Sequence, residues 1–194
     1  MPQREPRSRE RIVVGAADLI RRRGLAGSTV RDLAAHSGAP LGSTYHYFPR
    51  GKQQLAAEAV RFAGDMVTRV LERELEVGPA AGLRAFLALW RQTVIDSDFT
   101  AGCPVLAVAV EEPPDDTARE AITAAAEVFT AWEGLLSASL RDRGAAPEQA
   151  VRLAALIVAA VEGGVAMCRA KRDIQPLDDI AAQLEILVHT AVTE

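Results

Sequence analysis

Residues Thr29–Phe48 read TVRDLAAHSGAPLGSTYHYF, and this segment is the most informative in the chain. Its first part has the apolar spacing of a short helix, and its second part, which follows Gly38 and Pro40, is polar and aromatic. Glycine supplies the positive φ that a tight turn needs, and proline suits the first turn of the next helix. Two short helices joined in this way are typical of a helix-turn-helix, whose second helix enters the major groove of DNA.

Helix signals surround this motif. Thr29 and Asp32 have the spacing of a capping box, and either Ser28 or Thr29 can cap the helix that follows. Ser8 can cap an earlier helix, which ends at Gly24 after three arginines. Beside the helix that begins at about Val30, the chain is expected to form helices at about 8–24, 41–47, 52–77, 81–97, 104–111, 116–143, 148–169 and 177–192.

The composition favours an all-α protein. Of the 194 residues 49% are hydrophobic and only 5% aromatic, which suits closely packed helices around a sizeable core. No segment shows the period-2 alternation of a strand. We therefore expect an N-terminal three-helix helix-turn-helix domain at 1–52 and a helical domain at 53–194, with the helix 52–77 bridging the two.

The charge is unevenly distributed along the chain. Residues 1–50 contain nine arginines and four acidic residues, a net charge of +5, whereas the remainder contains 13 basic and 22 acidic residues, a net charge of −9. A basic first quarter on an acidic body suits a chain that offers one end to a polyanion. The alternative is a chance fluctuation on a solvated surface, which the accompanying turn motif disfavours.

Other classes of site have weak support. The two cysteines form no CxxC or Cys/His cluster, so neither a zinc site nor a disulfide framework is expected. No nucleophile–base pairing or phosphate loop points to an enzyme, a catalytic residue or a cofactor. The apolar run 150–167 is interrupted by Arg152 and Glu162 and is interpreted as a buried helix rather than a membrane span. With no signal peptide at the N-terminus, the expected location is the cytoplasm.

The order of many residues adds a family resemblance. Residues 8–62 resemble the N-terminal domain of TetR-type transcriptional repressors, and the resemblance covers about a third of the chain. The matching residues are Arg11-Ile12-Val13, Ala16-Ala17-Asp18-Leu19-Ile20, Gly24, Ser28-Thr29-Val30-Arg31-Asp32-Leu33-Ala34, Gly38, Gly42-Ser43-Thr44-Tyr45-His46-Tyr47-Phe48 and Lys52 to Leu55. The resemblance implies an all-helical homodimer whose C-terminal domain binds a small molecule and thereby releases the operator.

Two local features resemble one branch of this family. His46 stands one place earlier than in most members, and the link Pro49-Arg50-Gly51-Lys52 is one residue longer than the common form. The later segment Ala101-Gly102-Cys103-Pro104-Val105 also resembles the sequence of this branch.

Candidate DNA contacts follow from residue chemistry and from position in the family pattern. A groove helix needs a small residue where its backbone approaches DNA and polar tips that reach phosphates and base edges. By position, Thr29 and Lys52 are candidates for phosphates. The candidates at the groove are Arg31, Leu41, Gly42, Ser43, Tyr45, His46 and Tyr47. Tyr45 and Tyr47 have a competing interpretation as core aromatics, and Phe48 is expected in the core.

The second domain offers candidate ligand contacts. The pairs Phe86/Trp90 and Phe129/Trp132 each share a helix face and would enclose an apolar space if those faces met. The set of candidates is Phe86, Trp90, Thr93, Cys103, Phe129 and Trp132, and the expected effector is a small apolar or aromatic molecule. An ordinary hydrophobic core would have the same composition. For Cys103 the alternatives are a pocket wall, an oxidant sensor or a small buried residue.

The last two helices are expected to form a homodimer. The helix from 148 has apolar residues on more than one side, and the helix from 177 has an apolar stripe. A four-helix contact about a twofold axis fits both patterns. The leading hypothesis is thus a ligand-responsive repressor that binds a double-stranded DNA operator. The alternatives are an all-helical small-molecule carrier or enzyme that does not bind DNA, and an architectural DNA-binding protein without ligand control.

Overall fold

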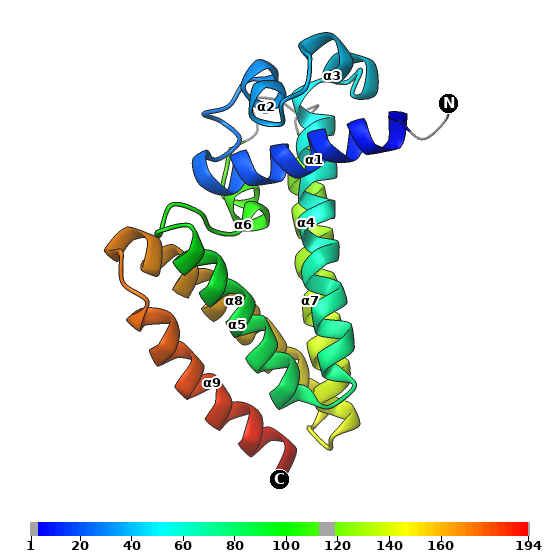
Figure 1. Cartoon of the computed structure of the whole chain (residues 1–194). Helices are drawn as coiled ribbons and strands as arrows, with labels where there is room; N and C mark the ends of the chain where they lie inside the picture. Colours follow the sequence, from blue (N-terminus) through cyan, green and yellow to red (C-terminus); the bar gives the residue numbers. More distant parts are fainter. Residues whose placement is uncertain (1–3, 113–118, 194) are drawn as a thin grey trace. The chain divides into compact units, whose positions relative to one another are not determined.

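The computed structural model describes residues 4–112 and 119–193, and within these ranges the long elements are all α-helices (Figure 1). They are α1 (Arg4–Arg23), α2 (Val30–His36), α3 (Leu41–Tyr47), α4 (Lys52–Leu75), α5 (Pro79–Asp96), α6 (Pro104–Ala109), α7 (Glu120–Asp142), α8 (Pro147–Lys171) and α9 (Gln175–Thr193). The expected all-α fold is confirmed.

Several helix boundaries differ from the sequence-based expectation. The predicted cap at Ser8 is wrong, because α1 already begins at Arg4. Pro79 and Pro147 both stand in the first turn of a helix, where a missing N–H costs nothing, so α5 begins two residues earlier than expected. Pro40 serves as the N-cap of α3 rather than as part of its first turn. The expected start of a helix at 116 lies outside the described residues.

The described chain packs as two compact units. Of the described residues, unit 1 comprises 4–65, 104–112 and 119–128, and unit 2 comprises 66–103 and 129–193. Both α4 and α7 contribute to each unit, because the division falls within these helices. The predicted boundary at residue 52 between two functional domains stays a prediction, and the packing adds that the described residues 104–112 and 119–128 are part of the unit that contains the helix-turn-helix.

The core of unit 1 joins the first three helices to α4 and α6. Its largest fully buried side chains come from α1, α2, α4 and the residue that follows α3: Ile12, Ile20, Leu33, Leu55 and Phe48. Phe48 is therefore a core residue, as expected. Since α2 and α3 are only seven residues long, they depend on this packing rather than on intrinsic helix stability.

In unit 2, α5, α8 and α9 pack against one another (Figure 1). The fully buried side chains include Leu83, Phe86, Trp132, Leu136 and Ile157. The helix α8 is long and apolar enough to cross a membrane, but half of its most apolar window is buried inside the fold. A helix that packs in a protein core can be as long and as apolar as this, so α8 is weak evidence for a membrane span.

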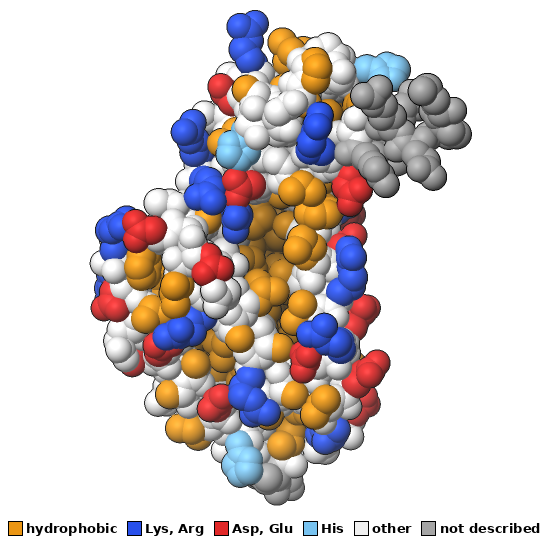
Figure 2. All heavy atoms as spheres, viewed as in Figure 1, with side chains coloured by type: hydrophobic (Ala, Val, Ile, Leu, Met, Phe, Trp, Pro, Cys, Tyr) orange, Lys and Arg blue, Asp and Glu red, His pale blue; other side chains and the backbone are white. Residues whose placement is uncertain are grey.

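The helix from 148 has apolar residues on more than one side, as expected, and part of this apolar surface is exposed in the single chain. Val151, Leu156 and Met167 on α8 are exposed in the single chain, as are Ile186 and Leu187 on α9. In Figure 2, apolar side chains are exposed between charged ones on the face that the helices of unit 2 present.

Candidate nucleic-acid interface and ligand-binding helices

A capping box begins α2. The Thr29 hydroxyl accepts a hydrogen bond from the Asp32 backbone N–H at 3.1 Å, and the Thr29 N–H donates to the Asp32 carboxylate at 2.8 Å. The hydrogen bond from the Thr29 side chain, followed by that from its backbone, lowers the pKa of Asp32. The predicted capping box is confirmed. Both Thr29 donors already serve the cap, so a phosphate at this position would have to displace one of these bonds.

The turn after α2 is held against α1 by a close backbone approach. Gly38 has a φ of +65°, the left-handed conformation that the sequence predicts for it. On the facing side, a Cβ added to Gly15 of α1 would stand 2.5 Å from Ser37 Cβ and 2.7 Å from Ser37 Cα. Only glycine lets α1 and the turn lie this close. The sequence analysis missed Gly15, although a glycine inside an apolar helix is a signal of close packing.

An ion-pair cluster fixes the other end of α2. Asp18 of α1 accepts hydrogen bonds from Arg21 and Arg22, and its carboxylate lies 2.7 Å from Nε2 of His36, the last residue of α2. Burial alone would raise the pKa of Asp18, but the hydrogen bonds from Arg22, His36 and Arg21 outweigh it and lower that pKa to about 2. His36 is thus a positioning residue at a helix end, as its place in the sequence suggests.

The helix α3 has one buried and one open side. Thr44 is fully buried, and its hydroxyl lies 3.3 Å from the Pro40 carbonyl oxygen. Tyr45 is 52% exposed, which excludes its alternative role as a core aromatic. A Cβ added to Gly42 would meet no atom within 4 Å. The open side of α3 therefore combines a small residue with polar and aromatic tips, as a groove helix requires.

The nine predicted DNA contacts all lie in unit 1. Arg31, Thr29, Gly42, Tyr45 and His46 are exposed, and Leu41, Ser43, Tyr47 and Lys52 are half-buried. They come from the start of α2, from α3 and from the first residue of α4. The rings of His46 and Tyr47 meet edge to face with centroids 5.3 Å apart. Figure 2 shows lysine and arginine side chains distributed over the surface that the first helices form.

Glu111, just after α6, contacts the loop between α1 and α2. Its Oε1 accepts hydrogen bonds from the backbone N–H groups of Leu25 and Ala26, the latter at 2.9 Å. A segment far away in sequence thus satisfies two donors of the loop that leads into the helix-turn-helix. Nothing in the sequence pattern around Glu111 indicates this contact, because it depends on the tertiary packing.

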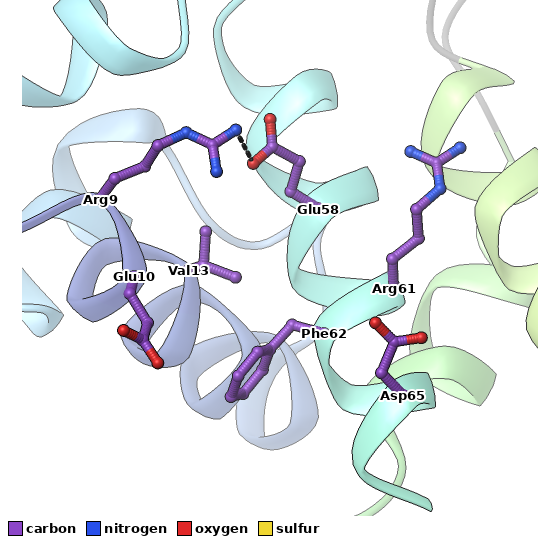
Figure 3. A pocket seen from close by; sticks show the side chains of 7 residues that line it. All are labelled: Arg9, Glu10, Val13, Glu58, Arg61, Phe62 and Asp65. Atoms are coloured by element: carbon purple, nitrogen blue, oxygen red, sulfur yellow. Dashed lines mark ion pairs between the residues drawn. The ribbon is translucent and has the colours of Figure 1, made fainter. Parts of the chain in front are cut away.

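A groove lies between α1 and α4 in unit 1. It encloses about 390 Å³ and is lined by Arg9, Glu10, Val13, Glu58, Arg61, Phe62 and Asp65 (Figure 3). Arg9 pairs with Glu58 across it at 2.5 Å, and Arg61 pairs with Glu127 at 3.2 Å. Since its arginines are satisfied by these pairs, the groove offers no unmatched positive charge to a phosphate.

The aromatic ligand candidates do meet in unit 2. The Trp132 ring lies 5.6 Å from Phe86, 6.4 Å from Trp90 and 5.7 Å from Phe129, measured between ring centroids. All three contacts are edge to face, an arrangement that aromatic rings prefer. Phe86, Trp90 and Trp132 are buried and Phe129 is half-buried. The two helix faces therefore meet, which the sequence analysis could state only as a condition, and a ligand role for these residues stays a prediction.

The polar ligand candidates are placed differently. The Thr93 hydroxyl donates to the Leu89 carbonyl oxygen at 2.9 Å, so its hydrogen is used within its own helix. Cys103 is buried, and neither cysteine is part of a disulfide bond. The sequence analysis assigned no role to Glu162 of α8, which is 3% exposed in the structure. Its signal was a single acid within an otherwise apolar run.

Comparisons with known proteins agree with this geometry. The model for bacterial regulatory proteins of the tetR family matches residues 12–59, and the model for the C-terminal domain of LmrA/YxaF-like transcriptional regulators matches residues 79–183. An uncharacterized HTH-type transcriptional regulator of Mycobacterium tuberculosis is 42% identical over 96% of this chain and 96% of its own. The HTH-type transcriptional regulator LmrA of Bacillus subtilis is 30% identical over 90% of this chain and 93% of its own.

A solved structure has the same fold. The crystal structure of a TetR transcriptional regulator from Legionella pneumophila superimposes with a TM-score of 0.81, covering 91% of this chain and 95% of that one at 20% identity. Together with the open α3, these similarities define a helix-turn-helix transcriptional regulator rather than an enzyme. The chain belongs to the TetR family of bacterial regulatory proteins, with a C-terminal domain of the LmrA/YxaF-like type.

Proposed function

We propose that this regulator is a ligand-responsive repressor, which binds its operator through α3 and releases it when a small molecule occupies unit 2. The observation that carries the DNA-binding half of the proposal is the open side of α3, with Tyr45 half-exposed and Gly42 clear of every neighbour. The net positive charge of residues 1–50 also favours binding of DNA, a polyanion, by this end of the chain. A cytoplasmic location follows from this role.

A homodimer through α8 and α9 is part of the proposal. Two recognition helices have to stand about 34–36 Å apart to enter successive major grooves, which one chain cannot provide. The exposed apolar side chains Val151, Leu156 and Met167 on α8, and Ile186 and Leu187 on α9, supply surface that a partner copy would cover. A ligand that prefers a different separation of the recognition helices would lower operator affinity.

The test begins with DNA fragments selected by the purified protein from random and upstream genomic sequence. Fluorescence anisotropy with a selected fragment, repeated at several salt concentrations, should give tight and salt-dependent binding. A failure to select any sequence would contradict the proposal. Release of the fragment by a small molecule from a screened library then separates a ligand-responsive repressor from an architectural DNA-binding protein.

Gly42→Ala is expected to leave folding intact and to weaken operator binding. The added methyl group meets no atom of the chain, and alanine favours a helix, so the melting temperature should stay unchanged or rise slightly. If the α3 backbone approaches the groove closely, the methyl group lowers operator affinity by about tenfold or more, ~1.4 kcal/mol. Thermal melting and anisotropy on the same sample check both halves. Unchanged affinity would show that DNA does not approach Gly42.

Lys52→Ala is expected to weaken binding equally for all DNA sequences. Lys52 is the first residue of α4, where its ammonium and the free N–H groups of the helix can meet one phosphate. Losing one phosphate contact per subunit should make the slope of log affinity against log salt shallower by about one unit for each contact. Salt titrations on operator and on random DNA measure the change. Loss of affinity for the operator alone would instead place Lys52 at a base edge.

A further inference from the structure

Glu162 is an ionisable group in an apolar interior. Its neighbours on the buried side of α8 are Val158, Val161 and Val165, and neither of its carboxylate oxygens has a partner of hydrogen-bond geometry among the described residues. Burial raises the pKa of Glu162 from 4.5 to about 8, and the nearby thiol of Cys103, a weak hydrogen-bond donor, offsets this only in part. A buried polar group without a partner is costly, so its presence calls for a physical explanation.

A second unsatisfied group lies on a helix that packs against α8. The indole Nε1 of Trp90 on α5 is buried and has no acceptor among the described residues. Trp90 belongs to the aromatic cluster of Phe86, Trp90, Phe129 and Trp132. Unit 2 therefore contains an unused acceptor and an unused donor, together with aromatic side chains that bury large apolar surfaces.

We propose that Glu162 is the polar anchor of the effector site, and that the effector is an apolar molecule carrying an amine or hydroxyl donor. The donor would hydrogen-bond to the Glu162 carboxyl group, the apolar body would contact the aromatic cluster, and an acceptor on the effector would take the Trp90 N–H. This inference rests on the proposed function, because it names the ligand class of that same repressor. An apolar molecule without a donor would leave the cost of burying Glu162 unrelieved.

Among the described residues, no charged group is recorded as shifting the pKa of Glu162, and two arginines of unit 2 have partners of their own. Arg91 of α5 pairs with Asp178 of α9 at 3.0 Å, and Arg169, two turns beyond Glu162 on α8, donates to the Thr100 carbonyl oxygen at 3.1 Å. The titratable neighbour that affects the pKa of Glu162 is Cys103, whose thiol lowers it. A cationic amine would therefore draw the proton off Glu162 on binding, whereas a neutral hydroxyl would leave it in place.

The test uses the full-length protein without DNA and three matched probes. They are 4-phenylbutylamine, 4-phenylbutan-1-ol and butylbenzene, which share an apolar body and differ in the donor. The two tryptophans of the chain, Trp90 and Trp132, both lie in the aromatic cluster and report binding by their fluorescence. We expect at least one donor-bearing probe to bind at least tenfold more tightly than butylbenzene.

Variants and proton release identify the anchor. Glu162→Leu should reduce the donor advantage to within about twofold, whereas Glu148→Leu, an exposed site on the same helix, should keep it. Glu162→Gln retains an acceptor and should keep the alcohol but lose the amine. Calorimetry at pH 7 in buffers of different ionisation enthalpy should detect proton release with the amine and none with the alcohol. These two arms distinguish a cationic from a neutral effector.

Two results would overturn the inference: equal or absent binding of all three probes, or a donor advantage that survives in a folded Glu162→Leu variant. Melting curves and operator affinity show whether each variant is folded. If the wild type binds its operator but shows no preference for the donor-bearing probes over butylbenzene, this inference is wrong and the proposed function stands. Absence of operator binding would defeat the proposed function, and the probe experiment would still decide the ligand class.

Discussion

Glu162→Gln is expected to abolish most of the pH dependence of stability between about pH 4.5 and pH 8. In the unfolded chain the Glu162 carboxyl loses its proton near its ordinary pKa of 4.5, whereas in the folded protein it holds the proton until about pH 8. The folded state binds more protons in this window, so rising pH favours unfolding. One pKa unit corresponds to about 1.4 kcal/mol, which makes the loss on the order of several kcal/mol by pH 8.

Thermal melts followed by circular dichroism from pH 5 to pH 8 measure this effect. The wild type should lose stability steadily as the pH rises, and the Glu162→Gln curve should be nearly flat and lie above it at pH 8. Glu148→Gln changes an exposed carboxyl of the same helix and should follow the wild type. Asp18 does not interfere, because its lowered pKa of about 2 makes its contribution disappear only as the pH falls below about 4. Parallel curves for wild type and Glu162→Gln would contradict the burial of an unpaired acid.

Gly15→Ala is expected to destabilise unit 1 and to impair operator binding together. In an open helix this substitution gains about 1 kcal/mol. Here the new Cβ would stand 2.7 Å from the Cα of Ser37, so α1 and the turn of the helix-turn-helix must move apart. Overpacking of this kind costs roughly 1–3 kcal/mol, and the displacement changes the position of α3. We expect a lower melting temperature and an operator affinity reduced by tenfold or more.

Gly134→Ala provides the matched control. Gly134 lies in α7, and a Cβ added there meets no atom within 4 Å, so the same chemical change should raise stability and leave operator affinity unaltered. Urea denaturation and anisotropy on both variants make the comparison. A Gly15→Ala protein as stable and as active as Gly134→Ala would show that the backbones of α1 and the turn can separate without cost.

The helix-turn-helix was predictable because its signals are local. A capping residue and its acid three positions later, a glycine with positive φ and a proline before α3 act within a few residues of one another, and they place Thr29, Gly38 and Pro40 near the expected positions. The polar and aromatic composition of α3 was predictable, but which of its residues face outward was not, since Tyr45 and Tyr47 could equally have been core aromatics. Whether these residues contact DNA stays a prediction.

The links between distant segments were not predictable. Glu111 satisfies backbone donors 85 and 86 residues earlier, and Gly15 allows the approach of a turn that begins more than twenty residues later. Glu111 stands in no distinctive local pattern, and the glycine at position 15 of an apolar helix signals close packing without indicating the partner segment. The contact between Phe86 and Trp132 was not predictable either, because the sequence does not show whether the two helix faces that carry them meet.

By itself the sequence determined the all-helical architecture, the helix-turn-helix and its polar α3, because helix periodicity, caps and turns depend on neighbouring residues. Only the tertiary structure decided which helix faces are covered, where α1 meets the turn, and that the Glu162 carboxylate is buried without a hydrogen bond of ordinary geometry to any described residue. Burial and hydrogen-bond satisfaction depend on which distant segments surround a group, and that information is absent from any local pattern.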